Sequence, residues 1–294
     1  MLPIGAGTAL VTPFTEDGAV DYDALARLAS WQVAEGIQFV VACGSTGEAQ
    51  TLNPDEREQV VRTVVQAVGG RIPVLAGATD NDTARAVIEA RRLGGLGVAG
   101  VMSASPYYNK PTQAGLIAHF EAIADAIPVP LLLYNVPSRT GVDLKPETVA
   151  MLALHPNIRG IKEASGNVRR MLDLTGQVPP DFVVLCGDDD IVVPAIAAGA
   201  HGLISVAGNA IPHRIASLVS AALNGQHQQA LAEQHRLLPF IDALFTESNP
   251  IPIKAALALL GRVNPAVRLP LVPCTPGLRE RLRLYLDQLE GARV

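Results

Sequence analysis

The feature that most constrains the fold is a regular alternation of short apolar runs and helical stretches over roughly the first two thirds of the chain. The runs are mostly continuous, as expected for parallel strands that are buried on both faces. The segments between them carry helical spacing, as at 21–34, where Leu25, Leu28, Ala29 and Val33 lie on one stripe. Strands are expected at 7–12, 39–42, 73–76, 100–103, 131–134, 158–163, 183–186 and 202–205.

This alternation predicts an α/β fold, and eight strands with intervening helices fit a (β/α)8 TIM barrel. A doubly wound open sheet is the alternative, although fewer strands would be expected for it. The alternation stops at about residue 205, and no flexible linker follows. We predict a barrel over 1–224 that carries the active site, and a C-terminal three-helix domain over 225–294. The helices expected after the last strand are 212–223, which would close the barrel, and 227–245, 252–260 and 276–289.

Composition excludes several classes of protein. With 49% hydrophobic residues, the 294-residue chain can bury a sizeable core, and a net charge of −5 argues against a nucleic-acid surface. Gly, Pro or charge interrupts each apolar run before it is long enough to cross a membrane. The first residues lack the pattern of a signal peptide, and three cysteines suggest no disulfide framework. These features predict a cytoplasmic protein.

Lysines are scarce, with four in the chain, and only Lys162 lies in a strand-like apolar run. Burial lowers the pKa of a lysine amine, and the neutral amine is a nucleophile for carbonyl carbon in Schiff-base enzymes. The ordinary alternative is a strand-end lysine whose amine reaches back to solvent. The residues expected around Lys162 favour the functional interpretation.

In such a barrel the active site lies at the carboxyl ends of the strands. Hydroxyls, tyrosines and an arginine follow the other predicted strands there, and this set suits carbonyl chemistry. An amine would attack, hydroxyls would move protons, and an arginine would hold a carboxylate. The candidates are Ser45 and Thr46 after the second strand, Tyr107 and Tyr108 after the fourth, Tyr134 and Arg139 at the fifth, and Lys162 in the sixth.

Simpler interpretations exist for several of these stretches. The segment 44–47 could be a turn with helix-capping hydroxyls, and adjacent tyrosines are commonly packing residues. The acidic run 188–190 could suggest a divalent metal, but the six histidines are scattered without a metal-ligand pair. No metal site is therefore predicted.

Together, three features resemble a known family. The segments 44–48 (Gly-Ser-Thr-Gly-Glu) and 134–141 (Tyr-Asn-Val-Pro-Ser-Arg-Thr-Gly), with Lys162, are similar to those of class I pyruvate-dependent aldolases. The family is the dihydrodipicolinate synthase / N-acetylneuraminate lyase superfamily, and the resemblance runs nearly end to end. An arginine at the position of Arg139 is typical of the synthase branch, so the resemblance is closest there.

The resemblance implies a role for each candidate. Lys162 would form an imine with pyruvate, and Tyr134 would donate and accept protons. Thr46 would link Tyr134 to Tyr108 in a proton relay, with Tyr108 supplied by the neighbouring subunit. The remaining implied roles are binding of the pyruvate carboxylate by Ser45 and Thr46, binding of the second substrate's carboxylate by Arg139, lining of the pyruvate pocket by backbone at Gly187 and Ile204, and packing of Tyr107 across a dimer interface.

The implied activity is that of a lyase that condenses pyruvate with L-aspartate 4-semialdehyde. The product would be 4-hydroxy-tetrahydrodipicolinate, on the diaminopimelate route to lysine. The imine turns the pyruvate methyl group into an enamine nucleophile, so no metal or other cofactor is expected. The family is usually a homotetramer built as a dimer of dimers, and no nucleic-acid or membrane partner is expected.

Two other functions stay open from the sequence. One is a related pyruvate aldolase or dehydratase acting on a sugar acid or related 2-oxo acid, which would share Lys162 and Tyr134. The other is a non-catalytic barrel with a binding role, which would not need Thr46, Tyr108, Tyr134 and Lys162 together.

The chain also departs from the family pattern. Ser45 stands where many synthases have threonine, and its hydroxyl can still bind a carboxylate. Family members that lysine inhibits carry an acidic residue where this chain has Arg85, and they tend to have histidines at the positions of Pro54 and Arg57. A cation at Arg85 would repel the amine of the effector, so we predict weak or absent inhibition by lysine.

Overall fold

The computed structural model of the chain describes residues 1–291. Its centre is a closed barrel in which each strand is paired with its sequence neighbours and β1 is also paired with β8, all in parallel. Every strand is buried along its length, apart from Arg159 in β6. The strands are β1 (Gly5–Ala9), β2 (Phe39–Ala42), β3 (Val74–Gly77), β4 (Gly100–Ala104), β5 (Leu131–Asn135), β6 (Ile158–Glu163), β7 (Val183–Cys186) and β8 (Gly202–Ser205).

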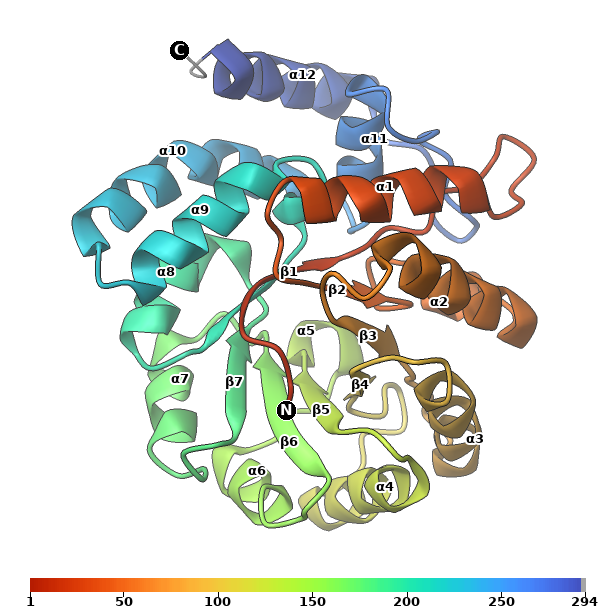
Figure 1. The fold of residues 1–294 in the computed structure, drawn as a ribbon, viewed down its shortest axis with the longest axis vertical. Helices are drawn as coiled ribbons and strands as arrows, with labels where there is room; N and C mark the ends of the chain where they lie inside the picture. Colours follow the sequence, from red (N-terminus) through yellow and green to blue (C-terminus); the bar gives the residue numbers. More distant parts are fainter. Residues whose placement is uncertain (292–294) are drawn as a thin grey trace.

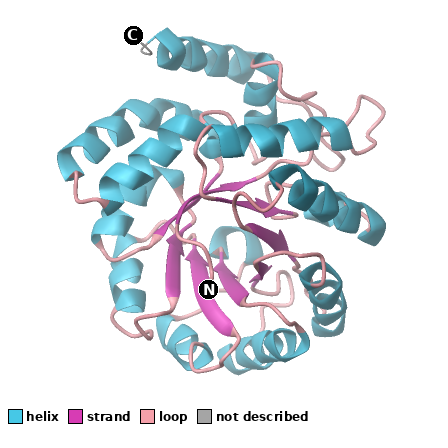
Figure 2. Cartoon of the chain, viewed as in Figure 1, coloured by secondary structure: helices cyan, strands magenta, loops and turns pink. Residues whose placement is uncertain are grey.

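Helices surround the barrel, so that the strands form the inner layer and the helices the outer one (Figures 1 and 2). They are α1 (Tyr22–Ala34), α2 (Pro54–Val68), α3 (Thr83–Gly94), α4 (Gln113–Ala126), α5 (Pro137–Thr140), α6 (Pro146–Leu152), α7 (Val168–Thr175), α8 (Val192–Ala197), α9 (Pro212–Leu223), α10 (His227–Leu244), α11 (Ile251–Leu259) and α12 (Pro276–Gly291), with short 3-10 turns η1 (Ala49–Thr51), η2 (Asp189–Ile191) and η3 (Ala207–Asn209).

Local sequence explains where the helices begin. Asn53 and Glu56 form a capping box at the start of α2, and Pro54 occupies its first turn, where a missing N–H costs nothing. Thr112 is the N-cap of α4, and its hydroxyl accepts from the backbone N–H of Gly115. Most of the predicted apolar stripe of α1 is buried, whereas Val33 is only partly buried.

Two apolar cores hold the layers together. The larger core lies between the strands and the helices, and the smaller one fills the barrel interior. Leu2 belongs to the interior core, and a Cβ at Gly100 would lie 2.8 Å from its Cδ2 atom. The amino-terminal end of the barrel is therefore plugged by packed side chains, which leaves the carboxyl ends of the strands for a site.

The predicted barrel is confirmed, with one visible difference at its first strand. That strand was expected at 7–12 but runs over Gly5–Ala9, because Gly5 pairs with Gly202 of β8. Beyond Ala9 the chain leaves the ladder for side-chain partners. The backbone N–H of Val11 donates to Asn209 Oδ1 at 3.1 Å, and the Thr12 hydroxyl donates to the carbonyl of Gly47 at 2.6 Å.

The three helices predicted after the barrel are present as α10, α11 and α12, and α10 packs against both α9 and α12. The division into domains at 224/225 stays a prediction, and residues 292–294 of the predicted C-terminal domain lie outside the described part. In the part that the structure describes, no helix combines the length and the apolar character required to span a membrane.

Candidate active site

A cavity opens at the carboxyl ends of the strands, and residues at the ends of β2, β5, β6, β7 and β8 line it. Its wall also includes Phe245 and Asn249, which come from beyond the barrel strands. The predicted site residues that line it are Ser45, Thr46, Tyr134, Arg139, Lys162 and Gly187.

Lys162 and Tyr134 face each other at the base of this cavity. They are direct partners in the β5–β6 register, and Lys162 Nζ lies 4.4 Å from the centre of the Tyr134 ring. Lys162 is 5% exposed. A Cβ at Gly187 would lie 2.8 Å from Lys162 Cε, so only glycine lets the end of β7 approach the lysine this closely. The amine is thus confined between an aromatic ring and a bare backbone, with the cavity in front of it.

A buried polar network holds the strand ends that carry these two residues. Glu163 Oε2 accepts from Asn135 Nδ2 at 3.0 Å, directly beside the Tyr134–Lys162 pair. Glu163 Oε1 accepts from the backbone of Ser165 at 2.8 Å, and Arg170 Nε lies 3.2 Å from Oε2. Burial raises the pKa of the Glu163 carboxyl, while its hydrogen bonds oppose that shift. The network fixes the register of β5 against β6 at the point where chemistry would occur.

Ser45 and Thr46 lie in a turn after β2, which we call the 44–47 turn. Gly47 N–H donates to the carbonyl of Gly44 at 3.0 Å, which closes the turn. The hydroxyl of Thr46 accepts from Asn249 Nδ2 at 2.9 Å, so its own proton is left to donate into the cavity. The turn thus offers two hydroxyls to a bound carboxylate.

Arg139 lies in α5, the single helical turn after β5. Its Nη2 atom donates to the backbone carbonyl of Asn249 at 3.2 Å. The guanidinium has further N–H groups, and Arg139 lines both this cavity and the cleft that adjoins it. A carboxylate at the mouth could therefore be bound by this arginine.

Three predicted site residues do not line this cavity. The Ile204 side chain packs in the apolar barrel interior and Val206 lines the cavity, while the lining by the Ile204 backbone stays a prediction. Tyr107 lines an adjoining cleft, which shares Tyr134 and Arg139 with the cavity, and burial raises the pKa of its hydroxyl. Tyr108 has a left-handed backbone (φ 70°) and is 86% exposed, so within one chain its ring faces solvent.

Within the acidic run 188–190, Asp189 has a structural role. Asp189 is fully buried, and it accepts hydrogen bonds from Ser205 Oγ and from the backbone of Val206 at 2.8 Å. Asp188 borders the cavity, and burial raises the pKa of its carboxyl to about 6, although nearby Lys162 opposes the shift. Across residues 1–291, no three His, Cys, Asp or Glu side chains are placed to hold a metal ion.

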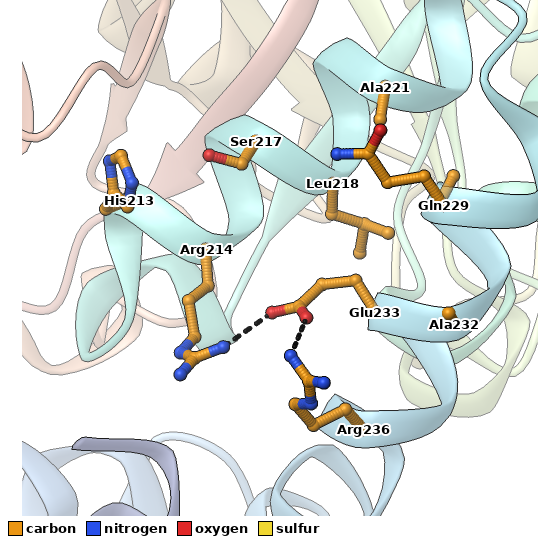
Figure 3. Close-up of a pocket in the computed structure, with 10 residues that line it drawn as sticks. His213, Arg214, Ser217, Leu218, Ala221, Gln229, Ala232, Glu233 and Arg236 are labelled. Carbon is orange, nitrogen blue, oxygen red and sulfur yellow. Dashed lines mark hydrogen bonds and ion pairs between the residues drawn. The ribbon is translucent and has the colours of Figure 1, made fainter. Parts of the chain in front are cut away.

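A second cleft lies away from the strand ends, between α9 and α10 (Figure 3). Two of the side chains that border it, Arg214 and Arg236, are both bound by Glu233, with N–O distances of 2.8 Å and 3.1 Å. Their charges are thus engaged within the protein, and the cleft offers no reactive group comparable to Lys162.

The model of the dihydrodipicolinate synthetase family matches residues 3–289. The chain belongs to this family. A 4-hydroxy-tetrahydrodipicolinate synthase of Koribacter versatilis is 48% identical to it over 279 residues, which cover 95% of this chain and 93% of the relative. One from an Exiguobacterium species is 47% identical over 289 residues, covering 98% and 99% of the two chains.

Solved structures agree with this assignment. The crystal structure of a chloride-inhibited dihydrodipicolinate synthase from Acinetobacter baumannii in complex with pyruvate superposes with a TM-score of 0.96 and 40% identity. The match covers 98% of this chain and 99% of that one. The resemblance inferred from the sequence is therefore confirmed at the level of the family.

Sequence reasoning missed residues of this family member that come from the C-terminal part. Asn249 contacts both Thr46 and Arg139, and its only local signal is the Asn-Pro-Ile-Pro segment that precedes an apolar helix. Lys254 lies within α11 and is completely buried against Glu48. A lysine inside an otherwise apolar helix was the available signal for it.

Proposed function

We propose that this protein is a 4-hydroxy-tetrahydrodipicolinate synthase, a lyase that condenses pyruvate with L-aspartate 4-semialdehyde. The observation that carries the proposal is the placement of Lys162, a buried lysine whose amine faces a cavity with Tyr134 beside it and Arg139 at its mouth. The names of the relatives and the pyruvate complex of a similar structure support the same reaction.

Lys162 starts the reaction as a nucleophile. Its Nζ attacks C2 of pyruvate, and the carbonyl oxygen leaves as water, which gives an imine. Tyr134, whose ring is next to the amine, passes protons to and from the oxygen that departs. Loss of a proton from the methyl group then makes C3 of the pyruvate unit an enamine carbon, without help from a metal.

The 44–47 turn binds the pyruvate carboxylate through Ser45 and Thr46. The Thr46 hydroxyl accepts a hydrogen bond from the side-chain amide of Asn249, so its own single proton is left to be donated towards the cavity. That polarity suits a relay that runs from Tyr134 through Thr46 to Tyr108.

Arg139 binds the carboxylate of the semialdehyde and so aims its aldehyde carbon at the enamine. A carbon–carbon bond forms between C3 and the aldehyde carbon, and the oxygen takes up a proton to become a hydroxyl. The amino group of the same substrate then attacks the imine carbon and displaces Lys162. The ring that forms is 4-hydroxy-tetrahydrodipicolinate, on the diaminopimelate route to lysine.

The proposal includes an assembly in which the neighbouring subunit completes the site. Tyr108 is exposed and strained within one chain, a combination that a partner surface would explain. A homotetramer built as a dimer of dimers, with Tyr107 at the tight interface, meets this need. A cytoplasmic location fits the three cysteines, all of which are free thiols.

Borohydride trapping tests the proposal. The protein is incubated with pyruvate and sodium borohydride, digested, and mapped by peptide mass spectrometry, while a parallel assay follows consumption of aspartate semialdehyde. We expect a reduced pyruvyl adduct on Lys162 and turnover of the semialdehyde.

The outcomes separate the remaining functions. An adduct on Lys162 without semialdehyde turnover would overturn the synthase assignment in favour of a related aldolase or dehydratase that takes another aldehyde. Absence of any adduct would overturn the Schiff-base mechanism and favour a non-catalytic barrel.

A further inference from the structure

Lys254 and Glu48 form an ion pair deep in the protein, next to the 44–47 turn. Lys254 Nζ lies 2.5 Å from Glu48 Oε1, and the two side chains are 0% and 2% exposed. The amine also donates to the carbonyl of Ala266 at 2.9 Å and lies 3.9 Å from the centre of the Phe14 ring. The pair joins α11 and the segment after it to the residue that follows the turn.

The backbone of the 44–47 turn is held in an unfavourable conformation at both ends. Cys43 before it has φ 56° and Glu48 after it has φ 51°, and both are left-handed although neither is glycine. Such residues persist only where the surrounding structure holds them, and they gather at functional sites. Contacts with other parts of the protein must therefore hold Glu48 in this conformation.

The Glu48 carboxylate is anchored from the C-terminal side by both of its oxygens. Oε1 accepts from the Lys254 amine, and Oε2 accepts from the backbone N–H of Arg268 at 3.0 Å. The guanidinium of Arg268 is in turn fixed by Glu56 at 2.6 Å and by the carbonyl of Thr51 at 2.8 Å. Glu48 is thus locked into a rigid frame.

A second contact reaches the turn from the same C-terminal segment. Asn249, at the turn before α11, donates to the Thr46 hydroxyl at 2.9 Å. Its Oδ1 atom is buried without a hydrogen-bond partner among residues 1–291, and Asn249 lines the cavity. The segment that carries Lys254 therefore holds the turn at Thr46 and again at Glu48.

Stability alone does not explain why a charged pair is kept here. A buried ion pair contributes little net stability, and replacing both partners by neutral residues is often neutral or stabilising. Burial even lowers the pKa of the Lys254 amine to about 8, although Glu48 opposes that shift. Such a pair instead restricts the local conformation, because each buried charge is stable only in an arrangement that keeps it paired.

We propose that Lys254 and Glu48 are a positioning pair that holds the 44–47 turn, and through it the hydroxyls of Ser45 and Thr46, in the geometry that binds the pyruvate carboxylate. This inference rests on the proposed function, because that function assigns the carboxylate to these hydroxyls. Neither Lys254 nor Glu48 touches the substrate in this account.

The test uses a double variant, Lys254→Met with Glu48→Gln, which removes both charges and leaves no unpaired buried ion. We expect its melting temperature to stay within a few degrees of wild type. The KM for pyruvate should rise at least about tenfold, while the KM for the semialdehyde stays within about twofold, because Arg139 lies outside the pair. Unchanged pyruvate KM in the folded variant would overturn the inference.

A matched control comes from the cleft between α9 and α10. Arg214 and Glu233 form a largely buried ion pair there (Figure 3), and neither residue lines the cavity that the 44–47 turn borders. Their double variant, Arg214→Met with Glu233→Gln, should leave both KM values unchanged. An equal rise of the pyruvate KM in this control would show a general loss of rigidity and would also overturn the inference.

A second variant and a prior trapping experiment ensure that the test gives a clear result. If the double variant does not fold, Glu48→Asp keeps the buried charges paired but shortens the carboxylate side chain by one methylene group, which draws it back from the Lys254 amine and the Arg268 N–H. That variant should raise the pyruvate KM about threefold or more, and an unchanged KM would contradict the proposal. Wild-type protein is trapped first with pyruvate and borohydride, so failure of the wild type to form an adduct would count against the proposed function instead.

Discussion

The molecule buries two lysines, and they differ in the polar groups that their amines contact. Lys162 and Lys254 are 5% and 0% exposed, and each amine lies over an aromatic ring, at 4.4 Å and 3.9 Å. Lys254 Nζ is bound by a carboxylate and a carbonyl, whereas residues 1–291 give Lys162 Nζ no hydrogen-bond partner. Lys162 faces a cavity instead.

The difference shows that burial alone does not make a lysine a nucleophile. An amine that is buried and paired with a carboxylate carries a proton on its lone pair and has no room beside it for a substrate. Its effect is to hold the neighbouring groups in place. An amine that is desolvated but left unpaired at a cavity wall is available for a carbonyl carbon. The structure therefore places the same side chain in two opposite settings, unpaired at a cavity in β6 and charge-paired in α11.

The largest effect should come from removing the unpaired amine. Lys162→Ala should lower kcat/KM by at least about 1000-fold and abolish borohydride trapping, because no other group can form the imine. The free energy of unfolding of this variant should stay close to that of wild type, because no hydrogen bond is lost. Steady-state kinetics and urea unfolding measure the two quantities.

The matched control for this variant is Lys145→Ala, which removes an exposed lysine at the start of α6. It should keep full activity and the adduct. An active Lys162→Ala enzyme, or an adduct that moves to Lys254, would break the contrast between the two buried lysines.

Removal of the paired amine should have its main effect on stability. Lys254→Met leaves the Glu48 carboxylate buried without its cation, which should cost about 3–5 kcal/mol in the free energy of unfolding. Urea unfolding of the single variant and of the double variant with Glu48→Gln measures this cost. The double variant should recover most of the loss, and a single variant as stable as wild type would show that the pair is not tightly coupled.

The pH dependence of the free energy of unfolding tests whether the pKa of the Lys254 amine is lowered. Burial lowers the pKa of Lys254 to about 8, whereas a lysine in an unfolded chain keeps its proton until about pH 10.4. Between these values the unfolded chain holds one more proton, so Lys254 makes the free energy of unfolding rise with pH, by up to about 1.4 kcal/mol per unit.

The measurement is urea unfolding at several pH values from 8 to 10, for wild type and for the Lys254→Met, Glu48→Gln double variant. Subtracting the two curves removes the titration of other groups, such as the buried thiol of Cys43, whose pKa burial raises to about 12. If the free energy of unfolding of wild type minus that of the double variant stays flat or falls as the pH rises, the lowered pKa of Lys254 is contradicted.

The two lysines also show how far sequence reasoning reaches. The strands were predictable because their apolar runs are local, and Lys162 was found because it lies in one of them. The contacts of Asn249 with Thr46 and of Lys254 with Glu48 join residues 203 and 206 positions apart, and no local pattern reports such pairs. The end of β1 was misplaced for the same reason, because Asn209, which draws Val11 out of the ladder, lies 198 positions away.

Free lysine, the effector that inhibits some members of the family, tests a weaker charge effect at the protein surface. Its amine would need a carboxylate, as Lys254 has in Glu48, but the chain presents Arg85, which is largely exposed and lies 3.8 Å from Asp82. Nearby Arg57 is already 3.7 Å from Glu89. Like charges there cost on the order of 1 kcal/mol, so millimolar lysine should lower initial rates by less than about twofold. Arg85→Glu should increase sensitivity about fivefold, and strong inhibition of the wild type would show that a cation at this position does not keep the effector amine away.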